Sequence, residues 1–216
     1  MQDIVIIGAG GFGREVKTII DTLNKDTKIY NFLGYYDDGI EKGKLVNGFP
    51  VLGNLEDLNN LKSNLSVVLG IGDPTVKSKI IASLNTNLLN FPTIIHPSVL
   101  ISSDDVAIGF GCVICAGTII TCNIKIGNFV TLNLMCTVGH DTQIDDFSAF
   151  MPSVNISGEV FVSEKVYVGT GAKIINQLTI GKNTIVGAGA VVSRSLPDNC
   201  TAVGIPAKPI KFHENE

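Results

Sequence analysis

Between residues 108 and 192 a single apolar position returns at every sixth residue without a break. It is occupied in turn by Ile108, Ile114, Ile120, Ile126, Leu132, Val138, Ile144, Phe150, Ile156, Val162, Val168, Ile174, Ile180, Val186 and Val192. A second apolar or small residue stands two positions before each of these, from Val106 to Ala190. An α-helix repeats about every 3.6 residues and a strand about every two, so neither element explains a period of six. The pattern is typical of a parallel β-helix, whose short strands meet at regular corners.

Three hexads complete one coil, so residues 18 apart stack on one another, and the fifteen hexads predict about five coils. The pattern ends near Leu196, because Pro197 breaks it. A short basic tail follows, which contains Gly204-Ile-Pro-Ala-Lys208.

The first 95 residues have a different pattern, in which apolar runs alternate with helical segments. Strands are predicted over residues 4–7, 29–36, 67–71 and 87–95. Helices are predicted over 14–23 and 54–61, and a third begins with Asp73 as N-cap and Pro74 at its first position. Gly48 and Pro50 indicate a loop. The order predicts a parallel sheet of about four strands with right-handed crossovers. We therefore expect two domains, residues 1–95 and 96–216, with the boundary at His96-Pro97.

Composition narrows the function classes. Aromatic residues make up only 6% of the chain and tryptophan is absent, which suits narrow coils filled by small aliphatic side chains. The net charge of −4 argues against a nucleic-acid partner. The N-terminus lacks the basic start of a signal peptide and no apolar run approaches about 18 residues, so a cytoplasmic protein without a membrane span is expected.

The chain has five cysteines, of which Cys112 and Cys115 form a Cys-x-x-Cys motif. Such a motif can bind a metal or carry out redox chemistry. However, Cys112 and Cys136 fall on the small inward position of the hexad, and no second cysteine pair follows. Buried core residues in a reducing compartment are therefore the favoured interpretation.

A glycine-rich loop follows the first predicted strand. Gly8-x-Gly10-x-x-Gly13 matches the dinucleotide fingerprint, and the acidic Asp37 ends the second strand. One interpretation is an NAD-dependent oxidoreductase. However, the α/β part ends near residue 95, which leaves about half of a doubly wound dinucleotide fold. A site for a nucleotide or nucleotide sugar fits better, and a tight turn that binds nothing is the remaining alternative.

One histidine lies at a corner of the predicted solenoid. His140 and Asp141 follow the inward residue Val138, so both side chains are expected to face outward. An imidazole beside a carboxylate suits a general base, although an ordinary surface histidine would give the same pattern. Gly158 stands one coil later, where a backbone N–H could reach a bound carbonyl and stabilise an oxyanion.

The sequence offers little support for other catalytic sites. His96 and His213 have no comparable carboxylate neighbour. A zinc site would need ligands gathered from scattered positions, so no metal is expected. The nucleophile-elbow motif of serine hydrolases is absent as well.

The chain resembles the hexapeptide acyltransferases in three features: the isoleucine-rich hexads, Val138-Gly-His-Asp141 and the terminal Gly204-Ile-Pro-Ala-Lys. The leading Gly8-Ala-Gly-Gly-Phe-Gly and Tyr35-Tyr-Asp-Asp38 narrow the resemblance to one branch. This branch contains the sialic acid O-acetyltransferases and the N-acetyltransferases of nucleotide-linked 4-amino sugars. The resemblance covers essentially the whole chain. It implies a left-handed β-helix, whereas the crossover rule alone would predict the opposite hand. It also implies homotrimers that bind acetyl-CoA between neighbouring solenoids.

The resemblance also implies roles for individual residues. His140 would take the proton from the acceptor amine, and Asp141, where relatives often carry Glu, would raise its basicity. The residues expected to line the acetyl-CoA site are Asn133, Ala149, Gly158, Thr170 and Ala188. Those expected to bind the nucleotide of the acceptor are Gly10, Gly11, Phe12, Asp37, Asp38, Gly72 and Asp73.

The function expected from these observations is direct acetyl transfer from acetyl-CoA to the C4 amine of a nucleotide-linked dideoxy-amino sugar in surface polysaccharide biosynthesis. UDP, dTDP and GDP would suit the glycine-rich loop equally well. Two alternatives remain at this point. One is O-acetylation of sialic acid or a related sugar. The other is a non-catalytic protein that binds sugar nucleotides.

Overall fold

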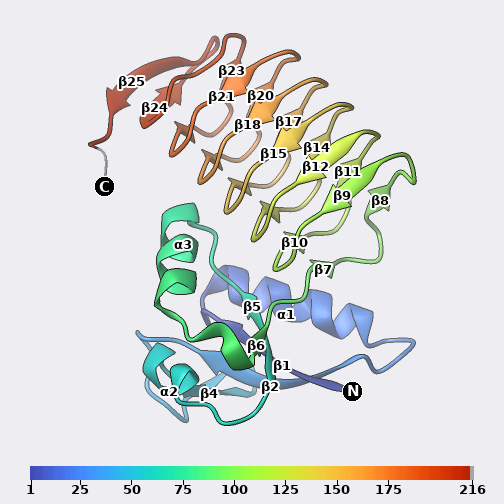
Figure 1. Cartoon of the computed structure of the whole chain (residues 1–216), viewed down its shortest axis with the longest axis vertical. Helices are drawn as coiled ribbons and strands as arrows, with labels where there is room; N and C mark the ends of the chain where they lie inside the picture. The colour runs from blue at the N-terminus through green and yellow to red at the C-terminus, as the bar shows by residue number, and fades with distance from the viewer. Residues whose placement is uncertain (215–216) are drawn as a thin grey trace.

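The computed structural model describes residues 1–214, in which a long solenoid stands on an α/β unit (Figure 1). The α/β unit contains a six-stranded sheet in the order β3-β4-β2-β1-β5-β6, parallel except for the β3–β4 pair. Its strands are β1 (Gln2–Ile7), β2 (Tyr30–Tyr36), β3 (Leu45–Val46), β4 (Phe49–Gly53), β5 (Leu65–Leu69) and β6 (Leu89–Asn90). Its helices are α1 (Gly11–Leu23), α2 (Leu55–Asn59), α3 (Pro74–Ser83) and the short 3-10 helix η1 (Thr86–Leu88).

The predicted start of α3 is confirmed, whereas that of α1 is displaced. The Asp73 side chain accepts a hydrogen bond from the Val76 N–H at 2.9 Å, and Pro74 occupies the first helical position. Helix α1 begins at Gly11, three residues before the predicted start, because the glycine-rich loop itself forms the first turn.

The predicted loop around Gly48 and Pro50 is instead a β-hairpin between β3 and β4. Its two turn residues, Asn47 and Gly48, have φ values of 48° and 83°. Positive φ at both positions is the mark of a type I′ turn, for which Asn-Gly is the preferred sequence. The Asn-Gly pair was therefore the overlooked signal, and it adds two strands to the sheet.

The last strand of the α/β sheet, predicted over residues 87–95, is confirmed only at β6, and its predicted length is wrong. The segment is divided into η1, β6 and β7 (Ile94–Ile95), and β7 pairs with the solenoid strand β10 instead of the α/β sheet. Pro92 has no N–H to continue a ladder, and the Phe91 carbonyl already accepts from Gly111 N–H at 2.9 Å. The hydrogen-bonded solenoid therefore starts at Ile94.

Three parallel sheets form the sides of the solenoid. The eight-stranded sheet holds β7, β10 (Val113–Ile114), β13 (Thr131–Leu132), β16 (Ala149–Phe150), β19 (Tyr167–Val168), β22 (Ile185–Val186), β24 (Cys200–Val203) and the antiparallel β25 (Lys208–Phe212). The six-stranded sheet holds β8 (Leu100–Ile101), β11 (Ile119–Ile120), β14 (Thr137–Val138), β17 (Asn155–Ile156), β20 (Lys173–Ile174) and β23 (Val191–Val192). The five-stranded sheet holds β9 (Val106–Ile108), β12 (Ile124–Ile126), β15 (Gln143–Ile144), β18 (Phe161–Val162) and β21 (Thr179–Ile180).

The coil register is the predicted one. Ile120 pairs with Val138 and Ile126 with Ile144, each 18 residues apart. The hexad residues from Ile114 onward are buried in one continuous core cluster, while Ile108 packs against it partly buried. Cys112 and Cys136 lie in the same cluster. The predicted small inward cysteines and the repeat of about five coils are confirmed.

Three corners join the sheets and are named here by one residue each. The His140 corner comprises residues 121–123, 139–141, 157–159 and 175–177. The Phe129 corner comprises 109–111, 127–129, 145–147, 163–165 and 181–183. The Asn133 corner comprises 115–117, 133–135, 151–153, 169–171 and 187–189. Each corner repeatedly uses a left-handed residue to turn the chain, such as Asp141 with φ of 58° and Phe129 with φ of 56°.

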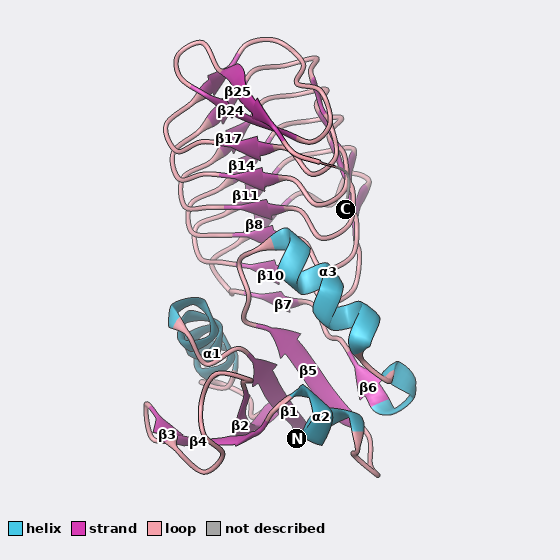
Figure 2. Cartoon of the chain, turned by 90° about the vertical axis from the view of Figure 1, so that its left-hand side faces the viewer, coloured by secondary structure: helices cyan, strands magenta, loops and turns pink. Residues whose placement is uncertain are grey.

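The α/β unit is docked on the eight-stranded sheet and the Phe129 corner, with α3 beside the first coils (Figure 2). The Lys77 side chain of α3 is 1% exposed. Its Nζ donates to the Phe129 carbonyl at 2.6 Å and to Thr131 Oγ1 at 3.1 Å. Burial lowers the pKa of this amine to about 7. Lys77 therefore fastens α3 to the solenoid through a buried polar contact.

Candidate active site

His140 lies between β14 and β15, and the left-handed Asp141 turns the chain immediately after it. His140 Nδ1 and Asp141 Oδ2 are 2.7 Å apart, and the two side chains are 57% and 48% exposed. The predicted pairing and outward orientation are thus both present. With Nδ1 bonded to a carboxylate, the proton-accepting nitrogen of a neutral imidazole would be Nε2.

The imidazole covers Gly158, the residue one coil further along. A Cβ atom added to Gly158 would overlap His140 Nε2. The Gly158 N–H has no hydrogen-bond acceptor among residues 1–214, although its carbonyl accepts from Gln177 N–H at 3.1 Å. Any larger residue here would displace the imidazole, and the unused N–H donor of Gly158 lies beside the histidine.

The charge of Asp141 is set by its hydrogen bonds. The bond from His140, and then that from Asn123, lower the pKa of the Asp141 carboxyl below its usual range. Asn123 Nδ2 donates to Asp141 Oδ1 at 2.9 Å. Asn123 is not among the predicted site residues, although its position 18 residues before Asp141 places it one coil away on the same corner.

Of the five residues predicted to line the acetyl-CoA site, four fall on two corners and one lies in a strand. Gly158 belongs to the His140 corner, which follows the strands of the six-stranded sheet. Asn133, Thr170 and Ala188 belong to the Asn133 corner, which precedes the strands of that sheet. Ala149 is buried in β16, where its N–H donates to the Val166 carbonyl. The single chain therefore brings only Gly158 to His140.

The residues predicted to bind the acceptor gather at the carboxyl ends of β1, β2 and β5. They form the predicted acceptor region, which comprises Gly10, Gly11, Phe12, Asp37, Asp38, Gly72 and Asp73. A Cβ added at Gly10 or Gly11 would meet nothing within 4 Å, and the N-cap of α1 has no side-chain hydrogen bond. This helix end is therefore open to an anion. Gly13 has a different role, since a Cβ there would overlap the Gly8 carbonyl and separate α1 from β1.

The acidic residues of this region also hold the loops. Asp37 Oδ2 accepts from Ala9 N–H at 2.8 Å, which fixes the glycine-rich loop. Asp38 Oδ1 accepts from Leu55 N–H at 2.9 Å at the start of α2. Near Gly72, an added Cβ would lie 3.8 Å from Met151 Cε on the Asn133 corner. Gly72 of the acceptor region thus lies beside the Asn133 corner of its own chain.

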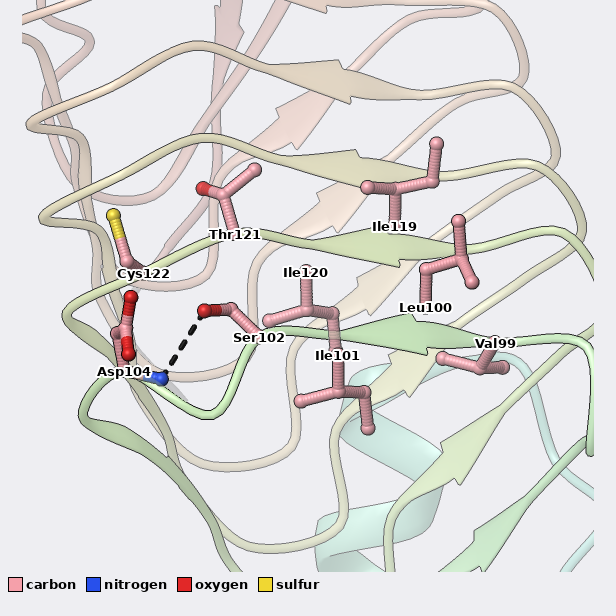
Figure 3. A pocket seen from close by; sticks show the side chains of 9 residues that line it. All are labelled: Val99, Leu100, Ile101, Ser102, Asp104, Ile119, Ile120, Thr121 and Cys122. Atoms are coloured by element: carbon pink, nitrogen blue, oxygen red, sulfur yellow. Dashed lines mark hydrogen bonds between the residues drawn. The ribbon is translucent and has the colours of Figure 1, made fainter.

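Two hollows lie at the margins of this arrangement: the first is lined in part by Thr121 and Cys122 of the His140 corner, and the second in part by the predicted acceptor-binding residue Asp73. One, of about 490 Å³, lies on β8 and β11 and is lined by Leu100, Ile101 and Ile119 (Figure 3). The other, of about 950 Å³, lies between α3, β19, β22 and β25. Neither contains His140, so neither is the predicted reaction centre.

Within residues 1–214, no group of three or more His, Cys, Asp or Glu side chains could hold a metal ion. In the same part of the chain, no helix is long and apolar enough to cross a membrane.

A β-helix with a His–Asp pair over a bare glycine, joined to an α/β half domain with an open glycine-rich loop, is typical of a hexapeptide-repeat acyltransferase. Comparison with known proteins specifies the family. Residues 3–84 match the model of the PglD N-terminal domain. Over 214 residues the chain is 33% identical to GDP-perosamine N-acetyltransferase of Escherichia coli O157:H7, covering 95% of each chain. The protein belongs to the hexapeptide-repeat nucleotide-amino-sugar acetyltransferases.

Solved structures agree with this assignment. A histidine-to-asparagine variant of perosamine N-acetyltransferase from Caulobacter crescentus, in complex with CoA and GDP-perosamine, superimposes with a TM-score of 0.86 at 29% identity and covers 98% of both chains. The acetyltransferase domain of PglB from Neisseria gonorrhoeae FA1090, in complex with acetyl coenzyme A, gives a TM-score of 0.87 at 31% identity, covering 97% of this chain and 99% of that one. The solenoid is accordingly the left-handed β-helix that the resemblance implied.

Proposed function

We propose that this protein transfers the acetyl group of acetyl-CoA to the C4 amine of a nucleotide-linked dideoxy-amino sugar. The observation that carries the proposal is the His140–Asp141 pair beside the unused N–H of Gly158. The full-length relative that acts on GDP-perosamine supports an amine acceptor and makes a GDP-linked sugar the first to test. O-acetylation and non-catalytic binding have no such support.

The chemistry follows from the three groups at the His140 corner. The amine attacks the thioester carbonyl while His140 Nε2 takes its proton, and Asp141 stabilises the resulting imidazolium. The Gly158 N–H donates to the oxyanion that forms on the carbonyl oxygen. The C–S bond then breaks, and the proton on His140 neutralises the CoA thiolate. Acetyl-CoA is a co-substrate, and the reaction needs no metal.

We further propose that the complete site forms between copies of a homotrimer. Gly72 of the acceptor region lies beside the Asn133 corner, and the six-stranded sheet separates that corner from His140 of the same chain. An acceptor bound to one copy would therefore meet His140 of the next. The exposed apolar residues along this side, including Leu100 (65%), Leu134 (41%) and Met135 (61%), suit contact with a second copy. Asn133, Thr170 and Ala188 would then line the CoA groove from the neighbouring copy.

The principal test measures CoA release with acetyl-CoA and a GDP-linked 4-amino sugar, for the wild type and His140→Ala. Loss of a general base should lower kcat by about 10²–10⁴-fold without changing the fold. Near wild-type turnover by His140→Ala would end the general-base assignment. A panel of UDP-, dTDP- and GDP-linked amino sugars, with free sialic acid, separates amine from hydroxyl acceptors.

The shared site is tested by co-expressing two inactive variants. Gly11→Trp fills the open acceptor region, and His140→Ala removes the base. If the two halves come from different copies, mixed oligomers regain part of the wild-type turnover, while neither variant alone does. Mixed oligomers that stay inactive would place both halves in one chain.

A cytoplasmic location is supported by the five free thiols, which belong to Cys112, Cys115, Cys122, Cys136 and Cys200.

A further inference from the structure

Each oxygen of the Asp141 carboxylate has a separate partner. Oδ2 bonds to His140 Nδ1 at 2.7 Å, and Oδ1 accepts from Asn123 Nδ2 at 2.9 Å. Asn123 lies one coil earlier on the same corner, and the Asp141 carboxylate connects its amide to the imidazole of His140. The carboxylate is therefore held from both sides.

We propose that Asn123 is a positioning residue for the transfer reaction, which fixes the plane of the Asp141 carboxylate and through it the orientation of His140. This inference rests on the proposed function, because it assumes that His140 is the base. Asn123 itself would touch neither the acceptor nor the thioester.

The need for such a residue comes from the short side chain of Asp141. A terminal carboxylate rotates within a broad energy well about its last torsion, so one hydrogen bond at an exposed corner holds it weakly. Asp141 is 48% exposed, and its side chain bonds only to His140 and Asn123 within the described residues. The Asn123 amide stops the rotation that would carry Oδ2 away from Nδ1. Its bond also contributes to the lowered pKa of Asp141, which agrees with an ionised partner for the imidazole.

Backbone geometry alone does not account for this contact. Asn123 has φ of 57°, and asparagine is among the residues that tolerate this left-handed region. That preference explains the residue type but leaves the side-chain direction open. Asn183 on the Phe129 corner is a natural control, with φ of 54° and an amide that donates to Asn199 Oδ1 at 2.8 Å. It makes the same kind of bond between coils, but on a corner that does not include His140.

The experiment compares Asn123→Gly with Asn183→Gly. Glycine removes each side chain without strain at positive φ, so both proteins should keep the fold. We expect Asn123→Gly to lower kcat about three- to tenfold with KM unchanged for both substrates, which corresponds to the loss of one exposed hydrogen bond to a charged group. Asn183→Gly should match the wild type. Equal kcat values for Asn123→Gly and the wild type would overturn the proposal.

A double-mutant cycle separates positioning from a structural effect. If Asn123 acts through Asp141, adding Asn123→Gly to Asp141→Asn should cause no further loss of kcat. A loss of the same size in both backgrounds would contradict the proposal. Asn123→Asp, which has the same size but no donor, should show at least the loss of the glycine variant, and full activity would again overturn the proposal. Full activity of His140→Ala, by contrast, would refute the proposed function itself.

Discussion

The His140 corner and the Phe129 corner are built from the same hexads and the same left-handed turns, yet they have opposite surroundings. At the Phe129 corner, Phe129 and Phe147 stack with ring centroids 5.2 Å apart and an interplanar angle of 8°. Phe91 and Phe110 meet Phe129 edge-on, and α3 lies over the corner. At the His140 corner the corresponding positions hold exposed polar side chains.

The difference shows that the charge states of the side chains at a corner depend on whether another element packs over it, more than on the corner's backbone conformation. Under α3 the Lys77 amine is desolvated, and its pKa is lowered to about 7. At the open corner, hydrogen bonds lower the pKa of Asp141 and keep it charged. The covered corner is therefore expected to govern stability, and the open corner to govern turnover.

The largest expected effect is that of Phe129→Ala at the covered corner. Phe129 is 4% exposed and contacts three other rings, so its removal should lower the free energy of unfolding by about 3–5 kcal/mol. Urea unfolding measures the loss. Phe110→Ala is the matched control, and since Phe110 is 54% exposed its effect should be much smaller. Equal losses for the two variants would contradict a packed aromatic corner.

The next effect concerns Gly158→Ala at the open corner. The new methyl group would displace the His140 ring and obstruct the Gly158 N–H, so kcat should fall by about 10²-fold. The exposed imidazole can rotate away, so the melting temperature should stay close to that of the wild type. A variant that loses stability but keeps its turnover per folded molecule would reverse the roles of the two corners.

The smallest effect is a pH dependence that arises from Lys77. In the folded protein its pKa is about 7, against 10.5 for the free side chain, so between these values the unfolded chain binds one more proton. Stability therefore rises with pH across this window, and the contribution from pH 7 to 9 is about 2 kcal/mol. Lys77→Met should lack this rise when unfolding is measured by urea at both pH values.

The stability measurement stops at pH 9 because the titration of three buried thiols opposes the effect of Lys77 above that pH. Burial raises the pKa of the Cys112, Cys115 and Cys136 thiols to about 11, 12 and 11, so their contribution to stability falls as pH rises above 9. The comparison with Lys77→Met removes most of this term, because both proteins keep the cysteines. Parallel pH curves for the two proteins would show that the Lys77 amine stays charged when buried.

Several features of this protein follow from its sequence alone. The hexads specified the solenoid and its register, because every coil repeats the same local contacts 18 residues apart. The same arithmetic placed His140 over Gly158 and would have found Asn123. Local capping chemistry placed the start of α3 at Asp73. The β3–β4 hairpin was missed, although its Asn47-Gly48 turn is also a local signal.

Only the tertiary structure decided how the α/β unit docks on the solenoid. The docking of α3 buries Lys77 against Phe129 and Thr131, which lie more than 50 residues further along the chain. Nothing periodic in the sequence links these residues. The same docking places Gly72 beside Met151 of the Asn133 corner instead of beside His140. A repeat determines its own contacts because each coil meets only its neighbours, whereas the contact between two unlike domains depends on surfaces that form only after both have folded.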